Sequence, residues 1–374
     1  MLSRLSNAPL NLQKLFPRNV VKLKNYCKIT KNTGHLDSTA EIQILSQLNK
    51  PFVDNNCTHL AGGYGFSVFC SGKTLNVIGL NTKSQLGIPS NHSSVVDHIT
   101  RVDLSLKKDS KILGISSGRL HTIISTTEGL FAAGCNTLGQ CGLNLEKEIE
   151  HFTKIECPII NSVKQVSCGL DHTLVLTEDN QILSTGWGAD GQTGLGQTME
   201  QHSLAQVQFP SNVRINKIAT KIDSCLALSD EGLVYSWGNS EYNQVGFATN
   251  DRKINIPTLI PTLKDVVDIA IGNTIGVALT AEGDVLIWGY GLLGRNDQPL
   301  LSKKPKKLTF LPEKRFVAVD CGLNYNVLFT EERELYFWGK CGTMLSRFPQ
   351  KIASNILKFC CGVNHLTIII DEDY

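Results

Sequence analysis

The side chains with the clearest chemical potential are histidines that follow a glycine by three positions. A histidine can move protons near neutral pH or bind a metal ion, and in one of these loops an aspartate precedes the histidine. The three sequences are Gly118-Arg119-Leu120-His121, Gly169-Leu170-Asp171-His172 and Gly362-Val363-Asn364-His365. No serine–histidine–aspartate set, metal-ligand spacing or paired carboxylate accompanies them, so we expect no catalytic residue, no metal and no cofactor. These histidines could contact a partner protein. Alternatively, their role is structural, and each histidine is bonded to neighbouring backbone.

Two further segments have residue types that can bind phosphate. Lys303, Lys304, Lys306 and Lys307 form the sharpest basic cluster, which indicates either contact with RNA phosphates or a solvated connecting loop. No aromatic residues are interleaved there to stack on bases. The glycine-rich loop Gly188-Ala189-Asp190-Gly191 lacks the helix and the lysine of a phosphate-binding loop, so we expect a tight turn.

The histidine loops belong to a repeat. The first repeated signature is a glycine loop followed by an apolar strand, and it occurs seven times, at Gly63, Gly118, Gly169, Thr220, Gly272, Gly322 and Gly362. The second is a short strand that ends in glycine, and six copies are clear, at Gly79, Gly134, Gly186, Gly238, Gly289 and Gly339. Their steps are 55, 52, 52, 51 and 50 residues, and a glutamine lies six residues past the glycine in four copies. This register indicates a repeat architecture.

Each repeat is expected to supply antiparallel strands. Turns such as Thr127-Glu128-Gly129 and Asp230-Glu231-Gly232 separate strand-sized apolar runs. A small sheet cannot bury both faces alone, whereas stacking around an axis buries them and removes exposed edges. We therefore predict an all-β fold, a single seven-bladed β-propeller closed by N- and C-terminal strands. Structural roles in it are predicted for the loop glycines Gly118, Gly169, Gly322 and Gly362 and for four tryptophans packed between blades, Trp187, Trp237, Trp288 and Trp338.

Closure of the ring should involve both ends of the chain. The last copy ends at Ile370 without a Trp-Gly strand, so the missing strand is expected from the N-terminal segment Asn25 to Gly34. Residues 22–374 would then form the propeller.

Composition and the N-terminus suggest where the protein resides. With 41% hydrophobic residues, 19% charged residues and a net charge of +2, the chain is globular and has no overall electrostatic attraction to nucleic acid. No apolar run is long enough to span a membrane. Residues 1–36 contain basic but no acidic side chains, so residues 1–21 are interpreted as a mitochondrial presequence, with a disordered basic tail as the alternative.

The paired glycine–histidine and Trp-Gly units resemble the regulator of chromosome condensation repeat over residues 22–374. The sequences GYGFS at Gly63–Ser67, GWGADGQTGLG at Gly186–Gly196 and WGNSEY at Trp237–Tyr242 resemble a mitochondrial, exchange-factor-like member of that family. This resemblance implies residence in the mitochondrial matrix, in peripheral association with the inner membrane.

Two functions follow from the resemblance. The first is support of mitochondrial ribosome assembly and translation through binding of large-subunit ribosomal RNA and assembly proteins, with the lysine cluster as the RNA-contact candidate. The alternative is guanine-nucleotide exchange on a mitochondrial dynamin-like fusion GTPase. In the nuclear relative, acidic and histidine side chains of the glycine–histidine loops on one face meet the GTPase. The resemblance assigns that role to Asp171, His172, Asp223 and His121.

Overall fold

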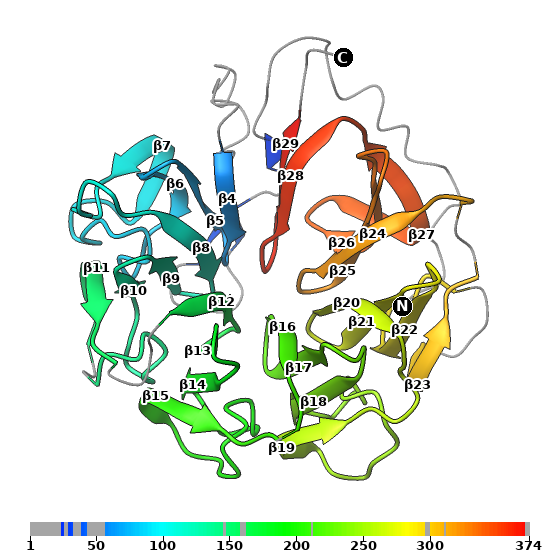
Figure 1. Cartoon of the computed structure of the whole chain (residues 1–374). Helices are drawn as coiled ribbons and strands as arrows, with labels where there is room; N and C mark the ends of the chain where they lie inside the picture. Colours follow the sequence, from blue (N-terminus) through cyan, green and yellow to red (C-terminus); the bar gives the residue numbers. More distant parts are fainter. Residues whose placement is uncertain are drawn as a thin grey trace.

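The computed structural model describes residues 57–144, 147–157, 162–210, 212–295, 300–309 and 312–370, together with short strands at 24–25, 29–32 and 39–42. Within these ranges every regular element is a β-strand, and the strands form antiparallel sheets arranged in a ring (Figure 1). No helix of the described residues is long and apolar enough to cross a membrane.

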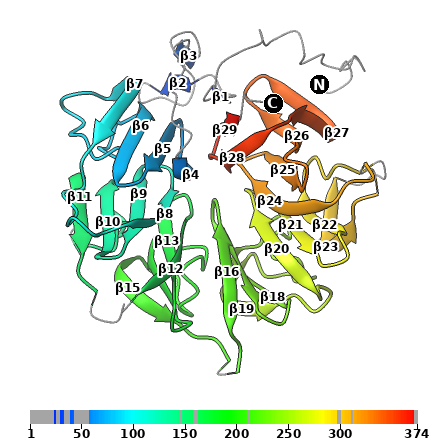
Figure 2. The same cartoon turned by 45° about the horizontal axis from the view of Figure 1, so that its top comes forward.

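Six of the sheets are four-stranded blades, whose strands follow one another in sequence from the centre of the ring to its rim (Figures 1 and 2). Blades 1 to 3 comprise β4 (Cys57–Gly62), β5 (Phe66–Ser71), β6 (Thr74–Leu80) and β7 (Val95–Val102); β8 (Ile112–Ser117), β9 (His121–Thr126), β10 (Gly129–Gly134) and β11 (Ile149–Ile155); and β12 (Val163–Cys168), β13 (His172–Thr177), β14 (Ile182–Gly186) and β15 (Gln201–Val207). Blades 4 to 6 comprise β16 (Ile215–Thr220), β17 (Ser224–Ser229), β18 (Val234–Asn239) and β19 (Lys253–Leu259); β20 (Val266–Ile271), β21 (Ile275–Thr280), β22 (Val285–Tyr290) and β23 (Leu301–Lys307); and β24 (Phe316–Cys321), β25 (Tyr325–Thr330), β26 (Leu335–Cys341) and β27 (Met344–Ala353).

Burial along the strands explains their composition. The second strand of a blade is covered on both faces, and every residue of β9, β13 and β17 is buried. These strands read as continuous runs of apolar and small polar residues because neither face meets water. The outer strands are half-exposed and mix polar with apolar side chains, as in β11. Tight turns close the predicted hairpins, with Gly129, Asn180, Gly232 and Gly283 in the left-handed region.

The prediction of a seven-bladed propeller is wrong, because the ring contains six four-stranded blades. Between blade 6 and blade 1 the last repeat forms only β28 (Ile356–Cys361) and β29 (Leu366–Ile370), and β1 (Lys24–Asn25) adds a third strand of two residues. No Trp-Gly strand follows β29 in the described residues, and the N-terminal segment supplies only two paired positions. These are Lys24 opposite Ile368 and Asn25 opposite Thr367.

Four further residues of the expected N-terminal partner, Ile29–Asn32, belong to another sheet. β2 (Ile29–Asn32) pairs with β3 (Thr39–Ile42) in a separate two-stranded sheet. Gly34 and the predicted presequence, residues 1–21, lie outside the described residues.

The innermost strands contact one another around the axis. β8 lies against β4 and β12, β20 lies against β16 and β24, and β28 lies against both β24 and β4. The hydrophobic core is divided among the interfaces between neighbouring sheets. One cluster, for example, joins Val277 and Leu279 of blade 5 to Phe316 and Trp338 of blade 6.

Candidate functional site

The glycine–histidine loops all lie at one end of the innermost strands, on the side of the ring that we call the loop face. The histidines of these loops are completely or almost completely buried, and each bonds to the following sheet. His121 Nε2 lies 3.0 Å from Thr173 Oγ1, His172 Nε2 lies 2.9 Å from Thr220 Oγ1, and His365 Nε2 lies 2.9 Å from Ser67 Oγ. The three histidines therefore have structural contacts, as the second interpretation predicted. Their hydrogen-bond partners, however, are side-chain hydroxyls of the neighbouring sheet instead of backbone groups.

The threonine hydroxyls determine which ring nitrogen carries the proton in His121 and His172. Thr173 donates its own proton to the Gln140 carbonyl at 2.8 Å, and Thr220 donates to the Ser224 carbonyl at 2.9 Å. The histidine must therefore donate from Nε2 in both pairs. Burial lowers the pKa of His121 and of His172 to about 3, and that of His365 to about 4, so all three are neutral at physiological pH.

The predicted structural glycines make room for these rings. A Cβ atom on Gly169 would lie 2.0 Å from His172 Cε1, and one on Gly118 would lie 2.3 Å from His121 Cε1. A Cβ atom on Gly362 would likewise clash with the ring of His365, and one on Gly322 would clash with the ring of Tyr325. The Tyr325 hydroxyl donates to the Gly362 carbonyl at 2.9 Å. Each of the four glycines thus permits a ring to cross from one sheet to the next.

The tryptophans separate into two kinds. Trp237, Trp288 and Trp338 precede the strand-end glycine and are fully buried, whereas Trp187 follows Gly186 and is only half-buried. The indole of Trp237 donates to the Gln192 carbonyl at 3.0 Å, and that of Trp288 donates to the Gln244 carbonyl at 2.7 Å. These two indoles thereby tie blades 4 and 5 to the preceding blade.

The repeated glutamines shape the loops that receive the indoles. The side-chain oxygen of each accepts a hydrogen bond from the backbone amide two residues earlier, at 2.8–3.0 Å, in Gln85, Gln140, Gln192 and Gln244. The tight turn expected at Gly188–Gly191 is of this type, with the amide of Asp190 bonded to Gln192.

A carboxylate cluster lies on the loop face over blades 2 to 4. Asp171 forms a two-point ion pair with Arg119 of the preceding repeat, and its side chain is 8% exposed against 43% for Arg119. Asp223 accepts a hydrogen bond from Gln192 at 3.2 Å. Burial, followed by the negative charges of Asp190 and Asp171, raises the pKa of Asp223 to about 6. Arg119 therefore pairs with Asp171, while neither Asp223 nor Asp190 forms an ion pair with another described residue.

The GTPase-contact candidates consequently differ in accessibility. Asp223 is half-buried, whereas Asp171 is buried in its ion pair with Arg119, and His121 and His172 are enclosed between blades. Sequence reasoning missed Asp190 as a neighbour of Asp223, and it also missed an aromatic pair on blades 4 and 5. The rings of Tyr242 and Tyr290 lie 5.5 Å apart and are exposed by 44% and 42%.

The lysine cluster is part of a strand, so the interpretation as a connecting loop is wrong. Lys303, Lys304, Lys306 and Lys307 lie on β23, the outermost strand of blade 5, and all are exposed. Lys307 forms an ion pair with Asp284 at 2.6 Å. Lysines on an edge strand oppose pairing with other chains and also leave positive charge available to a ligand.

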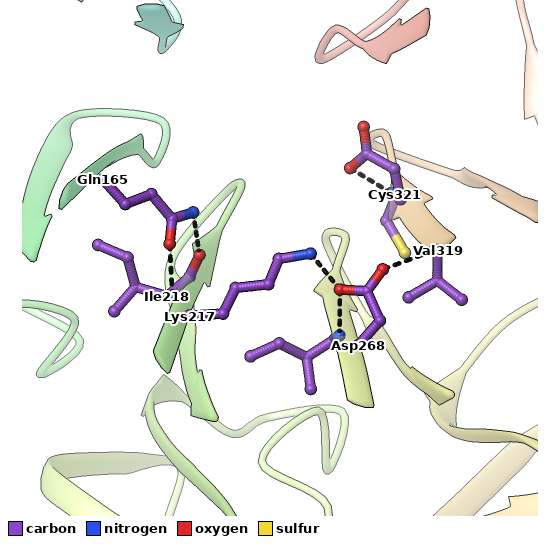
Figure 3. A network of polar contacts seen from close by, with 8 residues as sticks. Gln165, Lys217, Ile218, Asp268, Val319 and Cys321 are labelled. Atoms are coloured by element: carbon purple, nitrogen blue, oxygen red, sulfur yellow. Dashed lines mark hydrogen bonds and ion pairs between the residues drawn. The ribbon is translucent and has the colours of Figure 1, made fainter. Parts of the chain in front are cut away.

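A further polar network lines a cavity between the innermost strands of blades 3 to 6 (Figure 3). Asp268 of β20 pairs with Lys217 of β16 and accepts the backbone amide of Val319 of β24 at 2.9 Å. Gln165 of β12 binds both backbone groups of Ile218, at 2.8 and 2.9 Å. These contacts join the innermost strands around the axis.

The ring of blades and its interblade histidines define a β-propeller built from repeats. The chain belongs to the RCC1-like domain family, which matches residues 30–368.

Named relatives and solved structures agree with this assignment. The RCC1-like G exchanging factor-like protein of Mus musculus is 33% identical over 359 residues, which cover 85% of this chain and 77% of the mouse protein. The human protein of the same name is also 33% identical, over 85% of this chain and 76% of its own length. The crystal structure of human WBSCR16 matches with a TM-score of 0.79 and 32% identity, over 85% of this chain and 88% of that one. Prp20p of Saccharomyces cerevisiae shares the fold, with a TM-score of 0.73 and 17% identity over 95% of this chain and 93% of that one.

Proposed function

We propose that this protein regulates a GTPase, as a guanine-nucleotide exchange factor that binds through the loop face of blades 2 to 4. The carboxylate cluster of Asp223 and Asp190 beside the Arg119–Asp171 pair is the observation that carries this proposal. The names of the mouse and human relatives, which are exchange-factor-like proteins, support it.

Exchange requires no acid or base of the enzymatic kind. A protein accelerates nucleotide release when it binds the nucleotide-free GTPase more tightly than the loaded one. Asp223 suits such binding because its charge is already partly desolvated, so a cation of the partner gains a strong interaction at little further cost. The exposed rings of Tyr242 on blade 4 and Tyr290 on blade 5 offer apolar area for a partner that extends onto those blades.

The test measures release of fluorescent GDP from a purified mitochondrial dynamin-like GTPase. We expect stimulation by the native protein and a loss of about tenfold or more in Asp223→Asn, since truncating one partner of a desolvated charge pair costs about 2 kcal/mol or more. Asp284→Asn, on the outer part of blade 5, is the matched control and should act like the native protein. Equal stimulation by Asp223→Asn and the native protein would exclude this face.

A second candidate function is binding of mitochondrial large-subunit ribosomal RNA in ribosome assembly. The observation that favours it is β23, where Lys303, Lys304 and Lys306 are exposed side by side on an edge strand. Binding should weaken steeply with salt, and replacing these three lysines by glutamine should reduce the slope of log K against log salt by about 2. Filter binding with the ribosomal RNA and with Asp223→Asn as control measures this. A slope unchanged by the replacements contradicts the proposal.

We also propose that the protein resides in the mitochondrial matrix, peripherally bound to the inner membrane. The basic, acid-free composition of residues 1–36 supports this. Full-length chain incubated with isolated mitochondria should become protease-protected, lose residues up to about position 21, and be released by alkaline carbonate. A chain that stays outside and unprocessed contradicts the proposal.

A further inference from the structure

On the face opposite the loop face, four innermost strands carry an exposed apolar side chain near their start, and we call these four residues the collar. Every innermost strand has a bulge near its start, as between Ile112 and Gly114 in β8, which leaves its second residue out of the pairing. In four strands this second residue is apolar and 39–52% exposed: Leu113, Val267, Val317 and Leu357.

A cavity of about 460 Å³ opens beside part of this collar. Its lining combines Leu113 and Leu357 of the collar with deeper apolar groups such as Phe359, and it includes the cations Lys164 and Lys358. His59 also lines it, and no aspartate or glutamate is among its described lining residues.

A second cavity of about 320 Å³ continues along the channel, and its charge differs. Lys217 and Lys221 line it together with Asp268 and Asp320, so positive and negative groups balance there. Gln165 and Phe359 line both cavities and therefore lie at the boundary between them. In the outer cavity, by contrast, the described lining residues include lysines but no aspartate or glutamate to neutralise them.

The order of groups along the outer cavity is also informative. Leu357 is exposed at the mouth, and Lys358 and Phe359 follow it along β28 towards the boundary with the inner cavity. His59 lies close enough to Lys358 for the ammonium to lower the pKa of the imidazole, after the larger effect of burial. An exposed leucine and a half-buried lysine are therefore consecutive residues in the lining of the outer cavity.

We propose that this cavity is a binding site for a small amphipathic anion, a carboxylate on an apolar chain. The carboxylate contacts Lys358, and the chain lies against the apolar lining residues Phe359, Leu357 and Leu113. The volume is that of ordinary ligand pockets, and the charge-assisted contact inside a partly apolar site supplies the specificity.

Isothermal titration of the full-length protein with decanoate, below its micellar range, tests the site. We expect saturable one-to-one binding, weakened about tenfold or more in Lys358→Gln and retained in Lys358→Arg, because a hydrogen bond to a charged group contributes about that factor. Decanol and acetate should each bind at least tenfold more weakly, since one lacks the charge and the other the chain.

A second pair of variants keeps the test independent of any effect on folding. Leu357→Asp places a negative charge at the mouth and should abolish decanoate binding. Val267→Asp changes an equivalent exposed bulge residue that does not line the cavity, so it should bind like the native protein.

The source of the carboxylate is distinguished by a peptide arm, acetyl-Ala-Leu-Ala-Leu with a free or an amidated C-terminus. Binding of decanoate assigns the site to a free amphipathic acid, and binding of the free peptide alone assigns it to a protein terminus. The proposal is overturned if neither anion binds, if decanol binds as well as decanoate, or if Leu357→Asp and Val267→Asp behave alike.

Discussion

At the scale of single residues, the loops separate groups that hold the ring together from groups that remain available to a partner. His172 and Asp171 are adjacent, yet the histidine is enclosed against Thr220 while the carboxylate is bound by the partly exposed Arg119. The family resemblance assigned both to GTPase contact, because both match the glycine–histidine motif of the nuclear relative. The two differ because His172 is the first residue of β13 and points between the blades, whereas Asp171 is still in the loop before that strand.

Asp223 is the residue where function opposes stability. Its pKa is raised to about 6, against about 3.9 in an unfolded chain, so folding favours the protonated form. Its contribution is favourable below about pH 4 and is lost as the pH rises through 6. We therefore expect Asp223→Asn to increase the free energy of unfolding at pH 7 by on the order of 1 kcal/mol, while partner binding falls. Urea unfolding measures the first effect, and a decrease in stability at pH 7 would contradict it.

The buried histidines have the opposite pH dependence. The folded pKa of about 3 for His172 lies below the unfolded value near 6.5, so stability is present above pH 6.5 and is lost as the pH falls towards 3. Replacing His172 by glutamine removes this contribution. The difference in unfolding free energy between pH 7 and pH 5 should therefore be smaller in His172→Gln than in the native protein. An equal difference in the two proteins would show that His172 does not titrate on unfolding.

At the scale of elements, repeat spacing predicted the strands well and their pairing across repeats poorly. The hairpin turns and strand-sized runs were recognisable because they are local features. Lys217 and Asp268 are 51 residues apart, which makes them equivalent positions of successive repeats, and nothing in one repeat marks which of them will form an ion pair. The position of Trp187 after its glycine, unlike that of Trp237, was readable from the sequence and was overlooked.

Asp268 is expected to be the most sensitive polar residue of the innermost strands. It is buried, and its carboxylate joins β16, β20 and β24 through Lys217, Ile269 and Val319. Asp268→Ala leaves a partly buried ammonium and a buried amide without that partner, which should cost about 3 kcal/mol or more. Asp284→Ala removes the exposed pair with Lys307 and should cost less than about 1 kcal/mol. Urea unfolding of both variants checks this, and equal losses would contradict it.

At the scale of the whole molecule, the terminal sheet determines whether the ring is closed. Its backbone and side chains contact both neighbours: His365 bonds to Ser67 of blade 1, and Gly362 accepts the Tyr325 hydroxyl of blade 6. Lys221 of blade 4 also crosses the channel to donate to the Cys361 carbonyl at 2.5 Å. The sequence predicted that both ends of the chain meet here. It could not predict that, among the described residues, Lys24 and Asn25 make the N-terminal contribution, because these two carry no strand signature of their own.

Deleting residues 356–370 should therefore damage the entire protein and not only its last sheet. The truncated chain would expose the apolar sides of blades 1 and 6, where Phe337, Val327 and Phe69 are fully buried against the terminal sheet. Open edges of this kind also favour association with other chains. We expect loss of the single cooperative melting transition and a shift to large species in size-exclusion chromatography. A soluble monomer that melts cooperatively within a few degrees of the full chain would show that six blades are stable without closure.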